Sequence, residues 1–194
     1  MMSMVKSRTK KVISVLLLLL LVGIGIGGKR YMDKQKTEKE YQQGIELIQS
    51  YVTDYLVKNY QGIKKIEWQG IGVEYRNSPI LGPSLFGNYV DTDVKIYVSD
   101  KLFLTMTFRL NDETEYNDEL QKYVKKNILN SENTSSMLKM ELDNTIYVRD
   151  EVNKIIGLEV SEDQKKEFEK ITKNTNGSKK AKIVYNLEVH ELRY

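Results

Sequence analysis

The sequence predicts an α+β domain that follows an N-terminal transmembrane helix. Three observations lead to this fold class: an apolar run at residues 12–28, a helical repeat of apolar residues at 41–56, and segments of alternating polarity after it. The alternating segments are closely spaced, and parallel pairing would need a crossover helix between them, so antiparallel pairing fits better. We therefore expect a long amphipathic helix packed on a curved antiparallel sheet, in a cystatin-like or similar architecture.

The predicted transmembrane helix is residues 12–28, VISVLLLLLLVGIGIGG, in which only Ser14 is polar. At 1.5 Å per residue this run spans about 25 Å, and flanking lysines can extend to the interface to cover the rest of a bilayer core. A long C-terminal domain translocates largely regardless of flanking charge, so we expect the N-terminus inside and the domain outside the cell membrane. A cleaved signal peptide is the alternative, but the run is longer than a signal-peptide core, which favours a single-pass signal anchor.

This helix divides the chain into a basic cytoplasmic tail (1–11), the transmembrane helix (12–28), a polar spacer (29–40) and one extracytoplasmic domain (41–194). Residues 1–40 carry nine Lys or Arg and three Asp or Glu, whereas the domain carries 21 and 24. Charges of both signs in even mixture provide no basic face for nucleic acid, so we expect no nucleic-acid partner. The sequence has no cysteine, which excludes disulfides, thiolate metal sites and a cysteine nucleophile.

The domain begins with a predicted amphipathic helix. Apolar residues recur at three- and four-residue steps from Tyr41 to Leu56, which places them on one face. Gly62 can adopt the left-handed conformation that ends a helix. We expect this helix to lie on the sheet with its apolar face buried.

Three strands are predicted after the helix. Residues 66–75 alternate in polarity with a bulge at Gly70-Ile71, and residues 89–98 and 102–110 alternate without interruption. Ser99-Asp100-Lys101 is short enough to join the last two as a hairpin. These strands form the predicted antiparallel sheet.

The C-terminal half has weaker patterns. Residues 111–119 carry five carboxylates but lack the spacing of a calcium loop, so a solvated acidic turn is the better interpretation. Ser161 and Gln164 have the form of a capping box at a helix start. The remaining predicted elements are a short helix over 120–129 capped by Asn117, a polar linker at 130–136, a strand at 137–148 and a last strand at 182–192.

No arrangement of residues in the sequence indicates catalysis. His190 is the single histidine, so a multi-histidine metal site is excluded and no nucleophile is placed beside it. The segment Gly82–Gly87 contains a serine between glycines but is not G-x-S-x-G, and no phosphate-binding glycine motif is present. We expect a protein that is not an enzyme and that has no cofactor and no metal.

The loop at residues 76–87, RNSPILGPSLFG, is the candidate binding element. It is long, holds both prolines, and is unusually apolar for a connection between strands. One interpretation is that its apolar side chains lie under the sheet. The other is that they contact a partner, in which case the partner-binding residues are Ile80, Leu81, Leu85 and Phe86.

Residues 51–75, YVTDYLVKNYQGIKKIEWQGIGVEY, resemble a group of small membrane-anchored or lipoprotein-like extracytoplasmic proteins of Gram-positive bacteria, over about residues 41–110. Some anchored proteins of this kind protect their own cell against secreted toxins. The resemblance implies a membrane-anchored binding protein that neutralises a secreted toxin or an envelope enzyme, and carries over no site residues. The alternative is a structural or sensory accessory subunit of a cell-envelope or secretion complex. The protein partner and the oligomeric state stay open.

Overall fold

The structure is a computed structural model of the chain. It describes the backbone of residues 2–78, 82–83 and 87–192, and the side chains of residues 28–29, 31–76 and 87–192. The chain forms two compact units, Met1–Lys39 and Glu40–Tyr194.

The first unit is helical. Helix α1 (Met2–Asn59) forms it and continues into the second unit, so the predicted spacer is helical, with an ion pair of 3.8 Å between Lys34 and Glu38 one turn apart. Among the side chains that the structure describes, no helix is long and apolar enough to cross a bilayer, and residues 12–27 of the predicted transmembrane helix lie outside that description. The transmembrane helix therefore stays a prediction.

The second unit is built on a six-stranded sheet, whose strands are β2 (Lys65–Trp68), β3 (Ile71–Glu74), β6 (Tyr89–Tyr97), β7 (Phe103–Arg109), β13 (Lys182–Val184) and β14 (Val189–Glu191). Strands β6 and β7 form the predicted hairpin, with Asp91 opposite Arg109 and Tyr97 opposite Phe103. Strands β2 and β3 pair antiparallel with successive parts of β6 on its other edge. The predicted strand at 66–75 is thus confirmed as two segments separated at Gly70, whose φ is 98°.

The last predicted strand is also divided, and its pairing differs from the prediction. Strands β13 and β14 pair in parallel with β2 and β3, so the sheet is mixed and not purely antiparallel. The chain between β13 and β14 bends toward α1, where Gln49 donates a hydrogen bond of 2.7 Å to the Asn186 carbonyl and Gln42 one of 3.0 Å to the Leu187 carbonyl. These contacts interrupt the edge strand. The α+β class is confirmed, with the correction that its last edge is parallel.

The core lies between α1 and one face of the sheet. Trp68 is 1 % exposed, lies 5.9 Å from Phe108 between ring centroids, and donates its indole N–H to Thr53 of α1 at 3.0 Å. The predicted helical stripe is buried as expected, which confirms the amphipathic interpretation of this part of α1. Its buried apolar members are Tyr41, Ile45, Ile48, Val52 and Leu56.

The C-terminus of α1 is closed by a distant loop. The backbone N–H of Asn174 donates to the Asn59 carbonyl at 2.7 Å, and that of Ser178 donates to the Val57 carbonyl at 2.8 Å. The Ser178 hydroxyl also donates to the Tyr60 carbonyl at 2.7 Å. This loop follows β12 (Thr172–Lys173), which pairs with β1 (Tyr60–Gln61) directly after the helix. The last carbonyls of α1 are thus satisfied by residues more than a hundred positions away in the chain.

The predicted helix over 120–129 is wrong. A single turn of helix, α2 (Leu110–Glu113), is followed by the antiparallel pair β8 (Thr114–Asn117) and β9 (Lys122–Lys125). Asn117 accepts a hydrogen bond from the Leu120 N–H in the tight turn between them and caps no helix. The rings of Tyr116 and Tyr123 pack edge to face across this hairpin, 5.3 Å apart between centroids, which favours strands over a helix.

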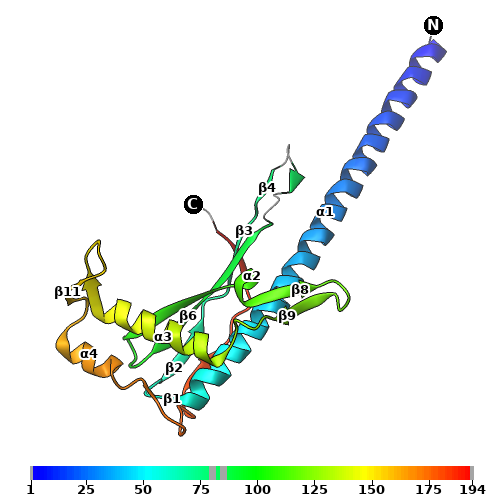
Figure 1. Cartoon of the computed structure of the whole chain (residues 1–194). Helices are drawn as coiled ribbons and strands as arrows, with labels where there is room; N and C mark the ends of the chain where they lie inside the picture. The colour runs from blue at the N-terminus through cyan, green and yellow to red at the C-terminus, as the bar shows by residue number, and fades with distance from the viewer. Residues whose placement is uncertain (1, 79–81, 84–86, 193–194) are drawn as a thin grey trace. The chain divides into compact units, whose positions relative to one another are not determined.

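The predicted linker and strand at 130–148 are also wrong over most of their length, because residues 131–146 form one helix, α3 (Ser131–Ile146), and only Tyr147 and Val148 of this range lie in a strand. The Asn130 side chain caps this helix by accepting from the N–H groups of Glu132 and Asn133, both at 2.9 Å. Thr134, Leu138 and Ile146 are its buried residues, four or eight positions apart, whereas Met140 is 52 % exposed. Helix α3 lies against β7 and shares the core with α1 (Figure 1).

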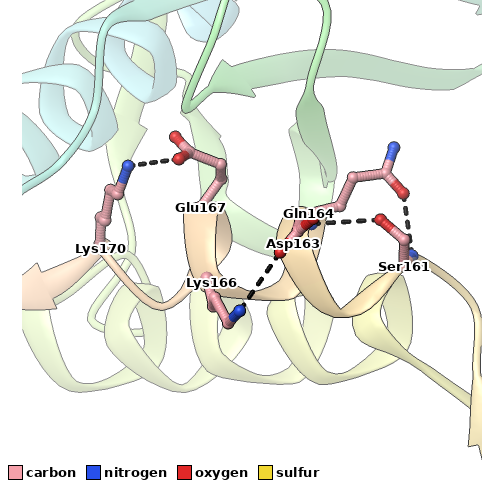
Figure 2. Close-up of polar contacts among 6 residues, drawn as sticks. All are labelled: Ser161, Asp163, Gln164, Lys166, Glu167 and Lys170. Atoms are coloured by element: carbon pink, nitrogen blue, oxygen red, sulfur yellow. Dashed lines mark hydrogen bonds and ion pairs between the residues drawn. The ribbon is translucent and has the colours of Figure 1, made fainter.

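The chain leaves α3 through the hairpin of β10 (Tyr147–Arg149) and β11 (Ile155–Leu158), which stands at the end of α3 (Figure 1). Helix α4 (Glu162–Phe168) follows and starts with the predicted capping box (Figure 2). The Ser161 hydroxyl accepts from the Gln164 N–H at 3.3 Å, and the Gln164 side chain accepts from the Ser161 N–H at 2.9 Å. Figure 2 also shows two ion pairs along α4, Asp163 with Lys166 at 3.2 Å and Glu167 with Lys170.

Candidate binding surface

The predicted partner-binding residues Ile80, Leu81, Leu85 and Phe86 lie outside the described residues. The backbone on either side of residues 79–81 forms a short antiparallel pair, β4 (Asn77–Ser78) with β5 (Gly82–Pro83). The role of these four side chains stays a prediction.

The described part of the chain contains a different candidate, the face of the sheet that points away from the core. Along β6 and β7 every second side chain is buried, and the side chains between them are half-buried or exposed. Helices α1 and α3 both contribute to the core on the opposite face. We name this surface the open face and define it by Lys65, Glu67, Gly72, Tyr89, Asp91, Asp93, Lys95, Tyr97, Phe103, Thr105, Thr107 and Arg109.

One end of the open face is a cluster of two rings and two lysines. The rings of Tyr97 and Phe103 lie 5.0 Å apart between centroids, with the ammonium of Lys65 4.7 Å from the first and that of Lys95 5.0 Å from the second. The Tyr97 hydroxyl donates to Glu67 at 2.7 Å, and Lys65 pairs with the same carboxylate at 2.9 Å. These two donors, Lys65 first, hold the pKa of Glu67 below its ordinary value.

The other end is centred on Tyr89. The guanidinium groups of Arg76 and Arg109 lie 5.6 Å and 5.3 Å from its ring, and Arg109 Nε donates to its hydroxyl at 3.0 Å. Asp91 lies beside this cluster, and burial raises the pKa of its carboxyl, although a hydrogen bond with Tyr89 opposes the shift. About 27 Å of β6 separates Tyr89 from Tyr97, at 3.4 Å per residue.

Four positions in register connect this second cluster to the edge of the sheet. Arg109 is opposite Asp91, Asp91 is opposite Gly72, and Gly72 is opposite His190 on β14. Because Gly72 has no side chain, the Asp91 carboxylate occupies the space above it, and a Cβ at Gly72 would lie 2.4 Å from Asp91 Oδ1. His190 is exposed at the end of this row. The structure thus brings the single histidine near a carboxylate of the open face, a neighbour that the sequence did not indicate.

The three aromatic side chains and Arg109 of the open face are of types enriched at protein interfaces, whereas its two lysines and three carboxylates are of types depleted there. Tyrosine and arginine are the residues most enriched at protein interfaces, since they combine large contact areas with donors that can be shared with a partner. Each ring at either end is already oriented by a cation, so little side-chain freedom is lost on binding. Among the described residues, no group of three His, Cys, Asp or Glu side chains is arranged to hold a metal ion.

The residues of the open face were missed at the level of sequence because only the buried half of each alternating strand was interpreted. The outward half of residues 89–109 contains three aromatic side chains and Arg109, and the same alternation that predicts the core assigns them to one face. Their cross-strand pairing depends on the register of β6 with β7, which the short turn between the two strands determines. No family model, curated protein or solved structure matches the chain.

Proposed function

We propose that the chain is a membrane-anchored, extracytoplasmic binding protein that uses the open face to hold a protein partner. The observation that carries this proposal is the pair of cation–aromatic clusters around Tyr89 and Tyr97, on a sheet face that the described helices leave uncovered. The apolar run at 12–28 supports an N-terminal, single-pass transmembrane helix. A helix on a curved sheet of this kind is compatible with a cystatin-like architecture.

The partner that we propose is a secreted toxin or an envelope enzyme, which the domain would neutralise. A rigid sheet with ordered aromatic and arginine side chains suits tight one-to-one binding, because such residues form the energetic centre of strong interfaces. The accessory-subunit alternative predicts a membrane complex as the partner. The identity of the captured protein separates the two.

Site-specific photo-crosslinking in the source cells tests the binding surface. A photoreactive amino acid replaces Thr107, an exposed residue in the middle of the open face, and in a matched control it replaces Gln43, an exposed residue of α1. We expect one dominant crosslinked protein from Thr107 and none from Gln43. Adding Tyr89→Ala and Phe103→Ala to the Thr107 variant should remove that product. Equal products from both positions, or a product that survives the two alanines, would refute the open face as the binding surface.

The anchor has a separate test. Leu18→Lys with Leu19→Lys places two charges near the centre of the predicted transmembrane helix, each costing about 2.5–3.5 kcal/mol, so membrane retention should be lost. The control Leu18→Ala with Leu19→Ala should stay in the membrane fraction. A mature protein that starts near Lys29 in mass spectrometry would show cleavage and overturn the anchor.

A further inference from the structure

The charges of the domain are segregated by the fold. Residues 55–66 and 170–187 contain eight lysines and no Asp or Glu, whereas the rest of residues 41–194 contains 13 Lys or Arg and 24 Asp or Glu. The first group therefore has a net charge of +8 and the remainder one of −11. The pairing of β1 with β12 and of β2 with β13 brings these two segments together at the C-terminal end of α1.

Five of these lysines have no carboxylate within 4.0 Å among the described residues, unlike Lys58, Lys65 and Lys170, which form ion pairs. All five are exposed. Lys182 is in register with Lys65, and its backbone N–H donates to the Lys64 carbonyl at 2.9 Å, so like charges are neighbours on adjacent strands. We name the five residues the lysine patch: Lys64, Lys173, Lys179, Lys180 and Lys182.

The patch borders a hollow in the surface. A cavity of about 460 Å³ is lined by Lys64, Lys179 and Lys180, with the backbone of Gly62 and Gly177 as part of its wall. The hydroxyl of Ser178 in that wall is already engaged by Tyr60 and Ile63, whereas the three lining lysines have no carboxylate partner within 4.0 Å among the described residues. An anion placed in this hollow would lie beside three lysines from two segments of the chain.

Interaction with the helix dipole does not account for the patch. Cations stabilise a helix C-terminus within its last turn, and Lys58 already occupies that turn of α1. The N–H groups of Asn174 and Ser178 already satisfy terminal carbonyls of the helix. Five further unpaired lysines repel one another in the absence of a ligand.

We propose that the lysine patch binds a base-free polyanion, such as a linear phosphodiester or polyphosphate polymer. Lysine is depleted from the centres of protein–protein interfaces but contacts phosphates readily as a point charge, which favours a polyanion over an acidic protein. Single-stranded nucleic acid needs aromatic side chains for base stacking. No aromatic residue of the described chain lines the hollow, and of the three tyrosines in residues 55–66 and 170–187 only Tyr185 is exposed.

The patch lies at one end of the domain's part of α1. The part of α1 in the domain runs from Glu40 to Asn59, about 30 Å at 1.5 Å per residue, and the patch lies at the end away from Glu40. The inference rests on neither the open face nor the anchor.

The test measures binding of medium-chain inorganic polyphosphate to the full chain in phosphatidylcholine nanodiscs, which have no net charge. The affinity of a flexible polyanion falls with salt at a slope of about −0.7 per contact, so five contacts predict a loss of about 100-fold between 50 and 200 mM NaCl. The triple variant Lys64→Gln, Lys179→Gln, Lys180→Gln should lose only about 10-fold over the same range and bind more weakly at 50 mM.

Two matched variants control for net charge and for folding. Lys101→Gln, Lys122→Gln, Lys154→Gln removes three exposed lysines outside the patch and should bind as the unmodified chain does. Lys64→Arg, Lys179→Arg, Lys180→Arg keeps the charge and should retain the affinity and the salt slope. Equal loss in the patch and control triples would overturn the proposal. Tighter binding of an oligothymidylate of equal charge, or patch-dependent binding of phosphatidylglycerol vesicles without binding of polyphosphate, would also overturn it.

Discussion

The carboxylate of Asp91 lies over the bare backbone of Gly72, on the open face of the sheet. A Cβ at Gly72 would meet Asp91 Oδ1 at 2.4 Å and Leu192 Cδ2 at 3.0 Å. Gly72→Ala should therefore push the carboxylate toward solvent and lower its raised pKa. Overpacking costs about 1–3 kcal/mol and the loss of glycine freedom in the unfolded chain offsets part of it, so we expect about 1 kcal/mol of destabilisation. Carbon NMR titration of the Asp91 carboxyl measures the shift, and an unchanged pKa would contradict this account.

Asp91 and Glu67 should give opposite pH dependences of stability. The pKa of Asp91 is raised by burial, so the folded chain binds its proton more tightly, and stability falls as pH rises from 3.8 through the raised value. The pKa of Glu67 is lowered by Lys65 and Tyr97, so its contribution is present above 4.5 and is lost as pH falls through the lowered value.

Urea unfolding between pH 3 and pH 7 checks both residues. In the unmodified chain, Asp91 lowers the free energy of unfolding as pH rises, and Asp91→Asn should remove this decline. Glu67 increases the free energy of unfolding as pH rises, and Glu67→Gln should remove this increase. The same slope change in both variants would contradict the assignment of opposite signs.

The glycine at position 177 has both a positive φ, 62°, and a close neighbour. A Cβ there would lie 2.1 Å from the Val57 carbonyl oxygen, which is backbone and cannot rotate away. Gly177→Ala should therefore displace the loop that closes α1 and cost about 3 kcal/mol or more, from left-handed strain and overpacking together. Gly87 is the matched control, since its φ is 66° and no described residue lies within 4 Å of its Cβ position.

Gly87→Ala should cost only the left-handed strain, about 1–2 kcal/mol. Chemical denaturation of both variants gives the comparison. Equal losses would show that the contact between Gly177 and Val57 contributes nothing to stability.

Trp68 links the sheet to α1 through its ring and through its indole N–H. Trp68→Ala should cost about 3–5 kcal/mol, because it removes a side chain that is 1 % exposed. Thr53→Val tests the hydrogen bond alone by leaving the buried indole donor without its partner, at a cost of about 1–3 kcal/mol. Thermal melts report both, and a neutral Thr53→Val would show that water replaces the lost acceptor.

Local periodicity in the sequence was sufficient to predict the secondary structure of elements that have one clearly apolar and one clearly polar face. The stripe from Tyr41 to Leu56, the alternation of β6 and β7 and the capping box at Ser161 each encode their own conformation, because side-chain period and cap chemistry are local properties. The α+β class and the core followed from these elements. The outward residues of the same strands, now the candidate binding surface, could have been predicted from the same alternation.

Tertiary contacts determined the secondary structure of the segments that were predicted wrongly. In α3, Leu138, Met140 and Leu142 alternate with polar residues, which is a strand pattern. The buried residues of this helix are instead Thr134, Leu138 and Ile146, whose spacing is helical. The few apolar residues after Asn117 have helical spacing, but residues 114–125 form a hairpin, in which Tyr116 packs against Tyr123 across the two strands.

The parallel edge and the lysine patch are also products of long-range contact. Hydrogen bonds from Gln42 and Gln49 divide the last strand, and its pairing in parallel with β2 places Lys182 beside Lys65 across more than a hundred residues of chain. The totals of 21 basic and 24 acidic residues average over the domain and do not reveal the lysine-rich segments 55–66 and 170–187, which the fold places side by side. The expectation of no nucleic-acid partner therefore loses this support and stays a prediction.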